Sequence, residues 1–283
     1  MKTNIMTIAF GFLGMFLFAS LAQAAVVTQY SFENNLTDTA PSGVSFDNLS
    51  ATSLVGPLNT VYVPGVVGRA VQIGGAFGDA TVLEAADSND LDLGGAEWTI
   101  EAFVYRTSDL NSQWERFAVK WFGPGGVAGP GTDFQWHWAF RDSTRTGGPK
   151  SQDLFADGFA NRINDTSTPE VPVGEWVHVA ITNDAANGLR AWQNGVVIDS
   201  QAFLTIADGS HPLRFGNNVV GETRFQFRGW VDEFLIHDVS QDAAYMEART
   251  ALSTIPEPTT LVIWSLLATL GLSFYRRRRR RAA

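Results

Sequence analysis

Apolar and polar residues alternate with a period of two along most of the middle of this chain. The clearest run covers residues 98–105, and further runs cover 133–141, 176–182 and 225–236. Glycine, proline, asparagine and aspartate separate these runs. A period of two places successive side chains on opposite faces of a β-strand. The pattern therefore predicts an all-β chain whose antiparallel strands pack as a jelly-roll β-sandwich.

Two local signals add detail to this prediction. Asn194-Gly195 separates two apolar runs and is typical of a hairpin turn in which both central residues have positive φ. Only residues 241–249 have the pattern of a helix, and Ser240 is the expected N-cap.

The N-terminus has the three parts of a signal peptide. Lys2 supplies the positive start, residues 5–21 are apolar, and Ala22-Gln23-Ala24 is a small-residue cleavage site. We therefore expect residues 1–25 to be removed on export.

The C-terminus also has three parts in a fixed order. Pro256, Glu257 and Pro258 precede an uncharged apolar run over 259–275, which is about the minimum length for crossing a bilayer. Arg276–Arg281 follow and are expected to stay on the cytoplasmic side of the inner membrane. The order predicts a transmembrane helix with everything before it outside.

This arrangement resembles the PEP-CTERM sorting signal of bacteria, here covering residues 253–283. The resemblance implies that an exosortase cuts near Pro256, Glu257 and Pro258 and that the span is a temporary tether. The alternative is a plain C-terminal membrane anchor, and the position of the motif directly before the span favours the sorting signal. The expected location is the cell surface or extracellular matrix.

The mature chain, residues 26–252, shows no change of composition that would divide it into two domains. Removing only Lys2 and Arg276–Arg281 from the count, with Glu257 kept, leaves 13 basic against 29 acidic residues, a net charge of −16. Such an acidic surface repels nucleic acid, so nucleic-acid binding is excluded. The chain has no cysteine, so neither disulfides nor thiolate metal sites can form.

Seven segments occur in the order expected of laminin-G-like, concanavalin A-like domains, and the chain resembles that family from about residue 26 to 250. The segments cover residues 30–35, 64–71, 98–104, 174–180, 191–195, 213–217 and 227–236. The chain departs from the pattern in residues 121–172, a stretch rich in Gly, Asp and Asn that we interpret as an insert.

No catalytic pattern stands out in the sequence. The resemblance includes glycosidases with a Glu-x-Asp-x-x-Glu strand, but Glu101 is here a single acid, and the adjacent Asp232 and Glu233 are expected on opposite faces of a strand. His137 and His178 lie between apolar neighbours and are interpreted as sheet residues. We expect no enzyme activity.

The resemblance implies a structural Ca²⁺ where the first and last strands meet, with Glu33 and Asp232 as the matching ligands. The alternative is that both acids only accept hydrogen bonds from loop amides. Asp38 and Asp47 lie in the same polar region and could also serve. The neighbouring set Asp87, Asp90 and Asp92 lacks the glycine and terminal glutamate of an EF-hand loop and is predicted to be solvated.

The chain contains nine Trp and 20 Phe, and exposed aromatic faces could stack on sugars. The row Phe134, Trp136, Trp138 and Phe140 shares one strand face, and the pattern favours a core position over an exposed one. Trp114 and Trp121 flank loops and are the predicted ligand-binding residues.

Together these features predict a secreted, non-catalytic domain that binds extracellular polysaccharide or another envelope component. The alternatives are a purely structural matrix or adhesion protein, and a glycosidase or polysaccharide lyase with an unrecognised site.

Overall fold

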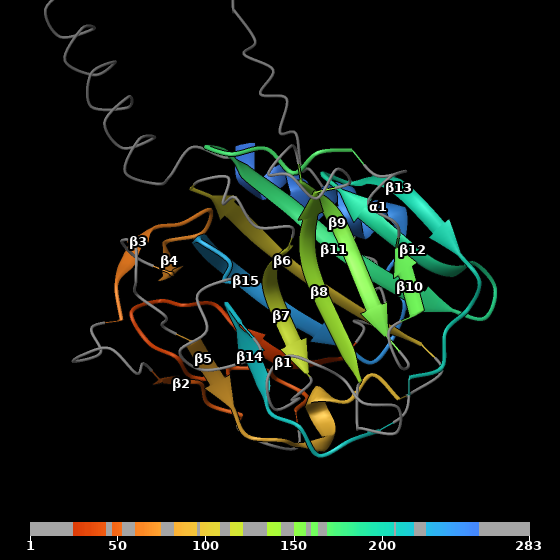
Figure 1. The fold of residues 1–283 in the computed structure, drawn as a ribbon, viewed down its shortest axis with the longest axis horizontal. Coiled ribbons are helices and arrows are strands. Elements are labelled where there is room, and N and C mark those ends of the chain that lie inside the picture. The colour runs from red at the N-terminus through yellow and green to blue at the C-terminus, as the bar shows by residue number, and fades with distance from the viewer. Residues whose placement is uncertain are drawn as a thin grey trace, which may run out of the picture.

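The computed structural model shows a sandwich of two antiparallel β-sheets with one α-helix, as the alternation predicts (Figure 1). The structure describes residues 25–43, 47–52, 60–74, 82–94, 97–107, 114–120, 135–142, 150–156, 160–163, 169–206, 208–217 and 225–254.

The larger sheet has eight strands in the order β13-β12-β11-β6-β15-β4-β3, and β1 also pairs with β15. Its strands are β1 (Val26–Tyr30), β3 (Tyr62–Pro64), β4 (Arg69–Ile73), β6 (Trp98–Arg106), β11 (Trp176–Asp184), β12 (Gly188–Gln193), β13 (Val196–Gln201) and β15 (Gly229–His237). The first and last strands therefore meet, as the resemblance implies.

The smaller sheet has seven strands in the order β10-β9-β8-β7-β14-β5-β2. They are β2 (Ser50–Thr52), β5 (Val82–Ala85), β7 (Trp114–Lys120), β8 (Trp136–Asp142), β9 (Lys150–Ala156), β10 (Ala160–Ile163) and β14 (Leu213–Phe215). The interpretation of 121–172 as an insert is wrong for its described residues, because β8, β9 and β10 belong to this sheet.

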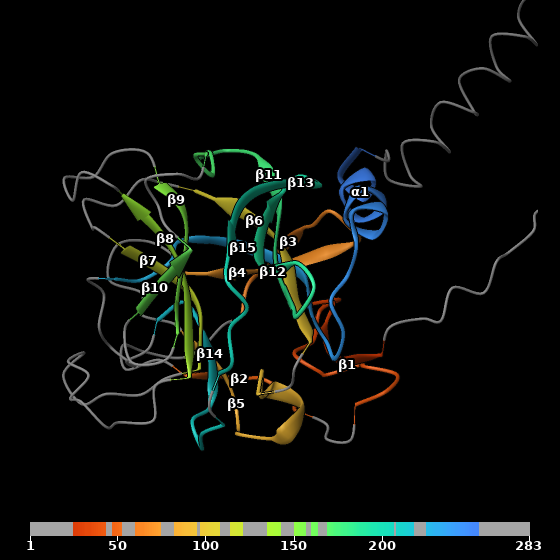
Figure 2. The same cartoon turned by 90° about the vertical axis from the view of Figure 1, so that its right-hand side faces the viewer.

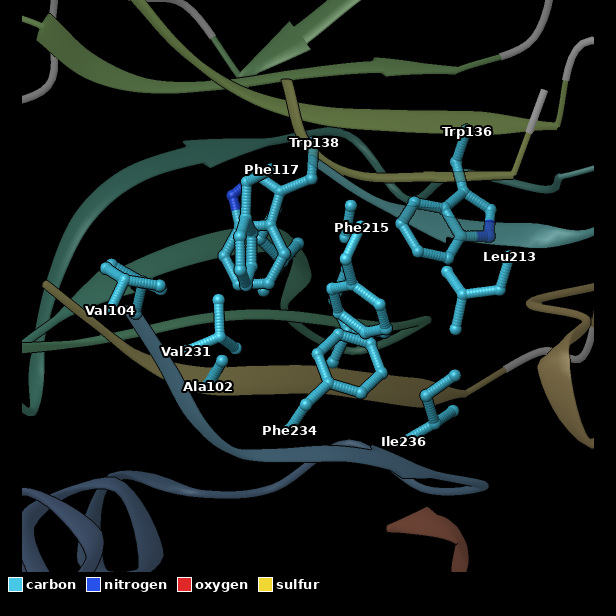
Figure 3. Close-up of a cluster of buried hydrophobic side chains, with 14 of the residues drawn as sticks. Ala102, Val104, Phe117, Trp136, Trp138, Leu213, Phe215, Val231, Phe234 and Ile236 are labelled. Atoms are coloured by element: carbon cyan, nitrogen blue, oxygen red, sulfur yellow. The ribbon is translucent and has the colours of Figure 1, made fainter. Parts of the chain in front are cut away.

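The aromatic row of β8 lies in the core between the sheets, as predicted. Trp136, Trp138 and Phe140 are fully buried, and Figure 3 shows Trp136 and Trp138 facing the side chains of the other sheet. Phe215 of the smaller sheet meets Phe234 of β15 edge to face, with ring centroids 4.7 Å apart. Phe134 lies outside the described residues.

A buried ion cluster joins the two sheets beside the apolar core. Arg106 of β6 donates from Nε to Glu115 of β7 at 3.0 Å, and Lys150 Nζ of β9 lies 3.2 Å from the same carboxylate. All three side chains are completely buried. A buried carboxylate of this kind is stabilised only when cations and hydrogen-bond donors surround it.

Strand β15 changes partner in its middle. Residues 229–231 pair with β4, residues 234–237 pair with β1, and the register with β6 shifts between Asp232 and Leu235. Glu233 has a φ of 49° at this irregularity. The simple expectation of opposite faces for Asp232 and Glu233 is therefore wrong, because regular alternation stops there.

Helix α1 (Ala243–Ala251) lies against the outer face of the larger sheet, on the side away from the smaller sheet (Figure 2). Its N-cap is Asp242, whose side chain accepts a hydrogen bond from the N–H of Tyr245. The prediction of Ser240 as N-cap is wrong, because the Ser240 hydroxyl donates to Asp184 instead.

Glu101 is the centre of the contact between α1 and the sheet. Its fully buried carboxylate lies 2.7 Å from His178 Nε2 and 3.0 Å from His237 Nε2. From α1, the hydroxyl of Tyr245 donates to it, and Arg249 Nε lies at 3.2 Å. Burial alone would raise the pKa of Glu101, but these donors hold it well below its usual value.

We predict that Glu101→Ala lowers the free energy of unfolding by about 3–5 kcal/mol, because it leaves buried donors without their acceptor. Denaturant titration monitored by circular dichroism measures the change. Glu175→Ala, which removes an exposed carboxylate, should change stability by less than about 0.5 kcal/mol. Equal stability of Glu101→Ala and wild type would contradict the role of Glu101.

Candidate functional site

The outer face of the smaller sheet carries aromatic and charged side chains. Along β8, residues 136, 138 and 140 face the core, so the alternate residues 137, 139 and 141 face away from it. The side chains on this face and beside it are Trp114, Arg116, His137, Arg141, Asp153, Phe155 and Phe225, which we call the outer-face cluster.

Three aromatic rings of the outer-face cluster contact one another. Trp114 meets Phe155 and Phe225 edge to face, with ring centroids 6.3 and 5.7 Å apart. The Arg141 guanidinium lies over Trp114, 5.3 Å from the ring centroid, and 5.9 Å from that of Phe155. Arg116 similarly lies 4.5 Å from the centre of Phe225. These cation–π contacts hold the rings and arginines in fixed relative positions.

The charged groups of the cluster are partly paired within it. Arg141 Nη1 lies 3.3 Å from Asp153, whose side chain is fully buried. The ring of His137 stacks on Phe155 with centroids 5.7 Å apart. Burial, together with the charge of Arg116, holds the pKa of His137 well below its usual value. His137 is therefore neutral at neutral pH.

The cluster has an accessible part and an enclosed part. Trp114, Arg141, Phe155 and Phe225 are half-buried, whereas Arg116 and His137 are at most 5% exposed. Aromatic rings can stack on the apolar faces of sugars, and arginine can donate to hydroxyl or carboxylate oxygens. The accessible part therefore has the chemistry to bind a carbohydrate.

Only part of this cluster was predicted from the sequence. Trp114 lies in it, and Trp121 lies outside the described residues. His137 and Arg141 were missed as site residues, although their alternation with the buried residues of β8 places them on its outer face. His178 is a satisfied sheet residue, as predicted, because it contacts Glu101.

The two predicted calcium ligands both hold the loop between β3 and β4. Asp232 Oδ2 accepts from Val66 N at 2.7 Å and Val67 N at 2.9 Å, and Glu33 Oε1 accepts from Arg69 N at 3.1 Å. Glycines allow this approach: a Cβ at position 65 would lie 2.5 Å from the Asp232 carboxylate, and one at position 68 would lie 2.1 Å from that of Glu33.

The second oxygen of Asp232 differs from the first. Asp232 is fully buried, and its Oδ1 has no hydrogen-bond partner in the described structure. Burial raises the pKa of Asp232 to about 7, and the negative charge of Glu233 adds to this rise. The hydrogen bond that Val67 N donates to the carboxylate lowers the pKa and offsets only part of the rise. An unpartnered buried oxygen of this kind is satisfied by a proton, a cation or a bound water.

The remaining acidic residues near the first strand have structural contacts. Asp38 Oδ1 accepts from Gln29 N and Ala40 N, both at 2.9 Å, and Asp47 accepts from the Ser88 hydroxyl. No group of three or more Asp, Glu or His side chains suited to a metal occurs within the ranges that the structure describes.

The prediction of a solvated set is wrong for Asp90 and Asp92, whereas Asp87 is exposed. Lys120 has a fully buried side chain whose Nζ lies 2.6 Å from Asp87 and also contacts Asp92. Asp90 is only 6% exposed. A buried lysine needs carboxylate partners, and these aspartates supply them.

Residues 1–24 of the predicted signal peptide, the motif at Pro256, Glu257 and Pro258, and the span at 259–275 lie outside the described residues. Within the part of the chain that is described, no helix is long and apolar enough to cross a membrane.

The two-sheet antiparallel sandwich has the architecture of a lectin/glucanase-like domain. A family model described as the concanavalin A-like lectin/glucanases superfamily, in its laminin G branch, matches residues 77–244. The chain belongs to this superfamily, which confirms the laminin-G-like resemblance. No curated protein matches the sequence of the chain.

Solved structures share the fold at low sequence identity. Domain 4 of AbnA, a GH43 extracellular arabinanase from Geobacillus stearothermophilus in complex with arabinotriose, matches with a TM-score of 0.57 and 16% identity over 80% of this chain and 98% of that one. The binding domain of Paraclostridial Mosquitocidal Protein 1 matches with a TM-score of 0.54 and 15% identity over 80% of this chain and 52% of that one.

A third match is to botulinum neurotoxin type C, in a structure concerned with its interaction with two ganglioside molecules. The TM-score is 0.53 and the identity 13%, over 81% of this chain and 51% of that one. The chain thus spans about half the length of the two toxin chains.

We predict that the stability of the metal-free protein depends on Asp232. Its pKa is higher in the folded state than the value near 3.9 of an unfolded chain, so the folded state binds this proton more tightly. The resulting stabilisation is full below about pH 4 and is lost as the pH rises to about 7.

Denaturant titrations in chelator at pH 4 and pH 7.5 measure this effect. Between pH 4 and pH 7.5 the free energy of unfolding should fall less for Asp232→Asn than for the wild type. The difference between the two falls should be on the order of 2–4 kcal/mol. Parallel pH profiles of the two proteins would contradict the assignment.

Proposed function

We propose that this chain is an exported, non-catalytic domain that binds an extracellular polysaccharide or another glycan of the cell envelope. The observation that carries the proposal is the outer-face cluster, in which the half-buried rings of Trp114, Phe155 and Phe225 lie beside Arg141. Two of the matched structures add support, since their descriptions name arabinotriose and gangliosides.

Two other functions make different demands on the same cluster. A purely structural matrix protein needs no ligand contact at Trp114. A glycosidase or lyase needs reacting carboxylates, and Asp153 is the carboxylate of this cluster that the structure describes. Asp153 is buried and paired with Arg141, which favours a structural role for it over proton transfer.

We predict that Trp114→Ala weakens glycan binding about tenfold or more, as expected for a central aromatic anchor. A glycan array identifies a ligand, and isothermal titration calorimetry measures the loss. The matched control is Trp176→Ala, which removes a half-buried Trp that contacts Tyr105 and Trp230 on the larger sheet.

If both substitutions weaken binding equally, or if Trp114→Ala leaves binding unchanged, the ligand binds elsewhere than at the outer-face cluster. Polysaccharide cleavage that disappears in Asp153→Asn would instead identify an enzyme.

A structural Ca²⁺ beside Asp232 is part of the proposal. Calcium prefers carboxylate and carbonyl oxygens, and the unpartnered Oδ1 of Asp232 is such an oxygen. Glu33 holds the other end of the same loop and supplies a second carboxylate. In this role the ion would neutralise acids that link the first strand to the last.

We predict that Ca²⁺ raises the melting temperature of the wild-type domain and that chelator reverses the rise. Calcium that binds only the folded state adds about 2.7 kcal/mol to the free energy of unfolding when its concentration is a hundredfold above the dissociation constant. The melting temperature of Asp232→Asn should change with neither Ca²⁺ nor chelator. Metal analysis that finds no calcium, together with an unchanged wild-type melt, would remove the ion from the proposal.

Export and processing complete the proposal. Residues 1–25 direct export, residues 26–252 form the surface domain, and residues 253–283 hold the chain in the inner membrane until an exosortase cuts near Pro256, Glu257 and Pro258.

We predict that Glu257→Ala or Pro258→Ala leaves an uncleaved, membrane-held chain in a cell that has an exosortase. Mass spectrometry of the surface fraction determines the C-terminus. Arg276–Arg281 on the mature surface protein would instead identify a plain anchor.

A further inference from the structure

Three aromatic side chains form a row on the outer face of the larger sheet, the face that α1 covers in part (Figure 2). Tyr105 of β6 lies opposite Trp176 of β11 on one side and Trp230 of β15 on the other. The rings of Tyr105 and Trp230 stack with centroids 4.2 Å apart, and the Trp176 ring lies 5.6 and 6.1 Å from them. All three side chains are half-buried. We call this row the aromatic platform.

Helix α1 runs along the same face toward the aromatic platform. The hydroxyl of Tyr245, in its first turn, donates to Glu101 of β6. One turn later the Arg249 guanidinium lies over the ring of Phe103, 5.5 Å from its centroid. Side chains on one face of a strand are two residues apart, so the next one on this face of β6 is Tyr105. The C-terminal end of the helix therefore points at the platform.

The described part of the chain ends at the edge of the aromatic platform. The 3-10 helix η3 (Leu252–Thr254) follows α1 and lies against β11, the strand that begins with Trp176. Three residues of a 3-10 helix advance about 6 Å, and two residues of a strand advance about 6.6 Å. The three residues of η3 thus cover the step from Phe103 to the platform, and residues 255–258 come next in the chain.

The sequence of residues 255–258, Ile-Pro-Glu-Pro, favours an extended conformation. Each proline fixes its own φ at about −65°, and Ile255 and Glu257 each precede a proline, which disfavours the helical region for them. These restrictions favour polyproline II, a helix with three residues per turn. Two of every three side chains can then contact a flat surface, so that Pro256 and Pro258 face it while Glu257 points to solvent.

The dimensions of the segment and of the aromatic platform agree. Pro256 and Pro258 are two residues apart, which is about 6 Å in polyproline II. The ring centroids of Trp176 and Trp230 are 6.1 Å apart. Three neighbouring strands span roughly 10 Å, and four extended residues reach up to about 14 Å. Aromatic-lined surfaces bind polyproline segments well, because a preformed polyproline II helix loses little entropy on binding.

We propose that the aromatic platform binds this chain's own segment Pro256-Glu257-Pro258, with the two proline rings against the three aromatic rings. The motif is then held on the folded domain. A docked motif cannot occupy the active site of a protease at the same time, so only the undocked fraction can be cleaved. This consequence rests on the processing proposed above, whereas the docking itself does not.

Disulfide trapping tests the docking in the full chain without its signal peptide, purified in detergent micelles. The native chain has no cysteine, so two introduced cysteines can pair only with each other within one molecule. The test pair is Thr259→Cys, directly after the motif, with Gln72→Cys on β4, opposite Trp230. The control pair is Thr259→Cys with Val196→Cys, an exposed position on β13 beside α1. A free tail of five residues reaches up to about 17 Å and would sample both positions.

Under mild oxidation, the disulfide within one molecule should form at least about tenfold faster in the test pair than in the control pair. Adding Trp230→Ala should remove this difference, because the platform loses a ring beside Gln72. Adding Pro256→Gly and Pro258→Gly together should remove it as well, because the tail loses its extended form. Thermal melts confirm that the Trp230→Ala chain is folded, and the proline substitutions leave every residue of the sandwich unchanged.

Three results would overturn the proposal. One is equal rates for the two pairs, or a fast test pair that neither the platform nor the proline substitutions slow. Another is disulfides between two molecules, which would identify a second copy of the chain as the occupant. The third is glycan binding that Trp176→Ala abolishes, which would identify a glycan as the occupant. Because the assay contains no exosortase, it measures docking independently of any cleavage of the motif.

Discussion

The pairing of β6 with β15 in the middle of the larger sheet is the interaction on which the rest of the structure depends. β15 pairs with β6 along one edge, and along the other it pairs first with β4 and then with β1. Its inward side chains Val231 and Phe234 belong to the core, while Glu101 of β6 and His237 of β15 hold helix α1 on the outside. One strand pair thus fixes the sheet, the core and the helix together.

Buried charged groups set how the layers of this cysteine-free domain align. Apolar contacts tolerate small shifts, whereas hydrogen bonds to a carboxylate act only over a narrow range of distance and angle. The Arg106, Glu115 and Lys150 cluster fixes one sheet relative to the other, and Glu101 fixes α1 on the larger sheet. Asp232 and Glu33 act in the same way on the loop between β3 and β4.

The strands could be predicted from the sequence because a period of two is a local property of the chain. The row Trp136, Trp138 and Phe140 was placed in the core for the same reason. The prediction for Asp92 was wrong because its partner Lys120 lies on β7, which long-range strand pairing brings near it and which no local pattern shows.

The candidate site was only partly predictable for a related physical reason. Trp114, Arg141 and Phe155 meet because β7, β8 and β9 are neighbours in the smaller sheet, and this order is set by long-range pairing. The residues of 121–172 departed from the family pattern in sequence, yet their described part supplies two of those three strands. Composition alone made this region resemble an insert.

The attachment of α1 also determines how the domain would respond to a pull on its C-terminal end. Force would reach α1 first, and side-chain contacts to Glu101 hold this helix, whereas backbone ladders on both edges hold β15. The nine residues of α1 span about 13 Å as a helix and about 30 Å when extended. Release of the helix would therefore lengthen the connection while leaving the sandwich closed, so that α1 would act as an extensible link under load.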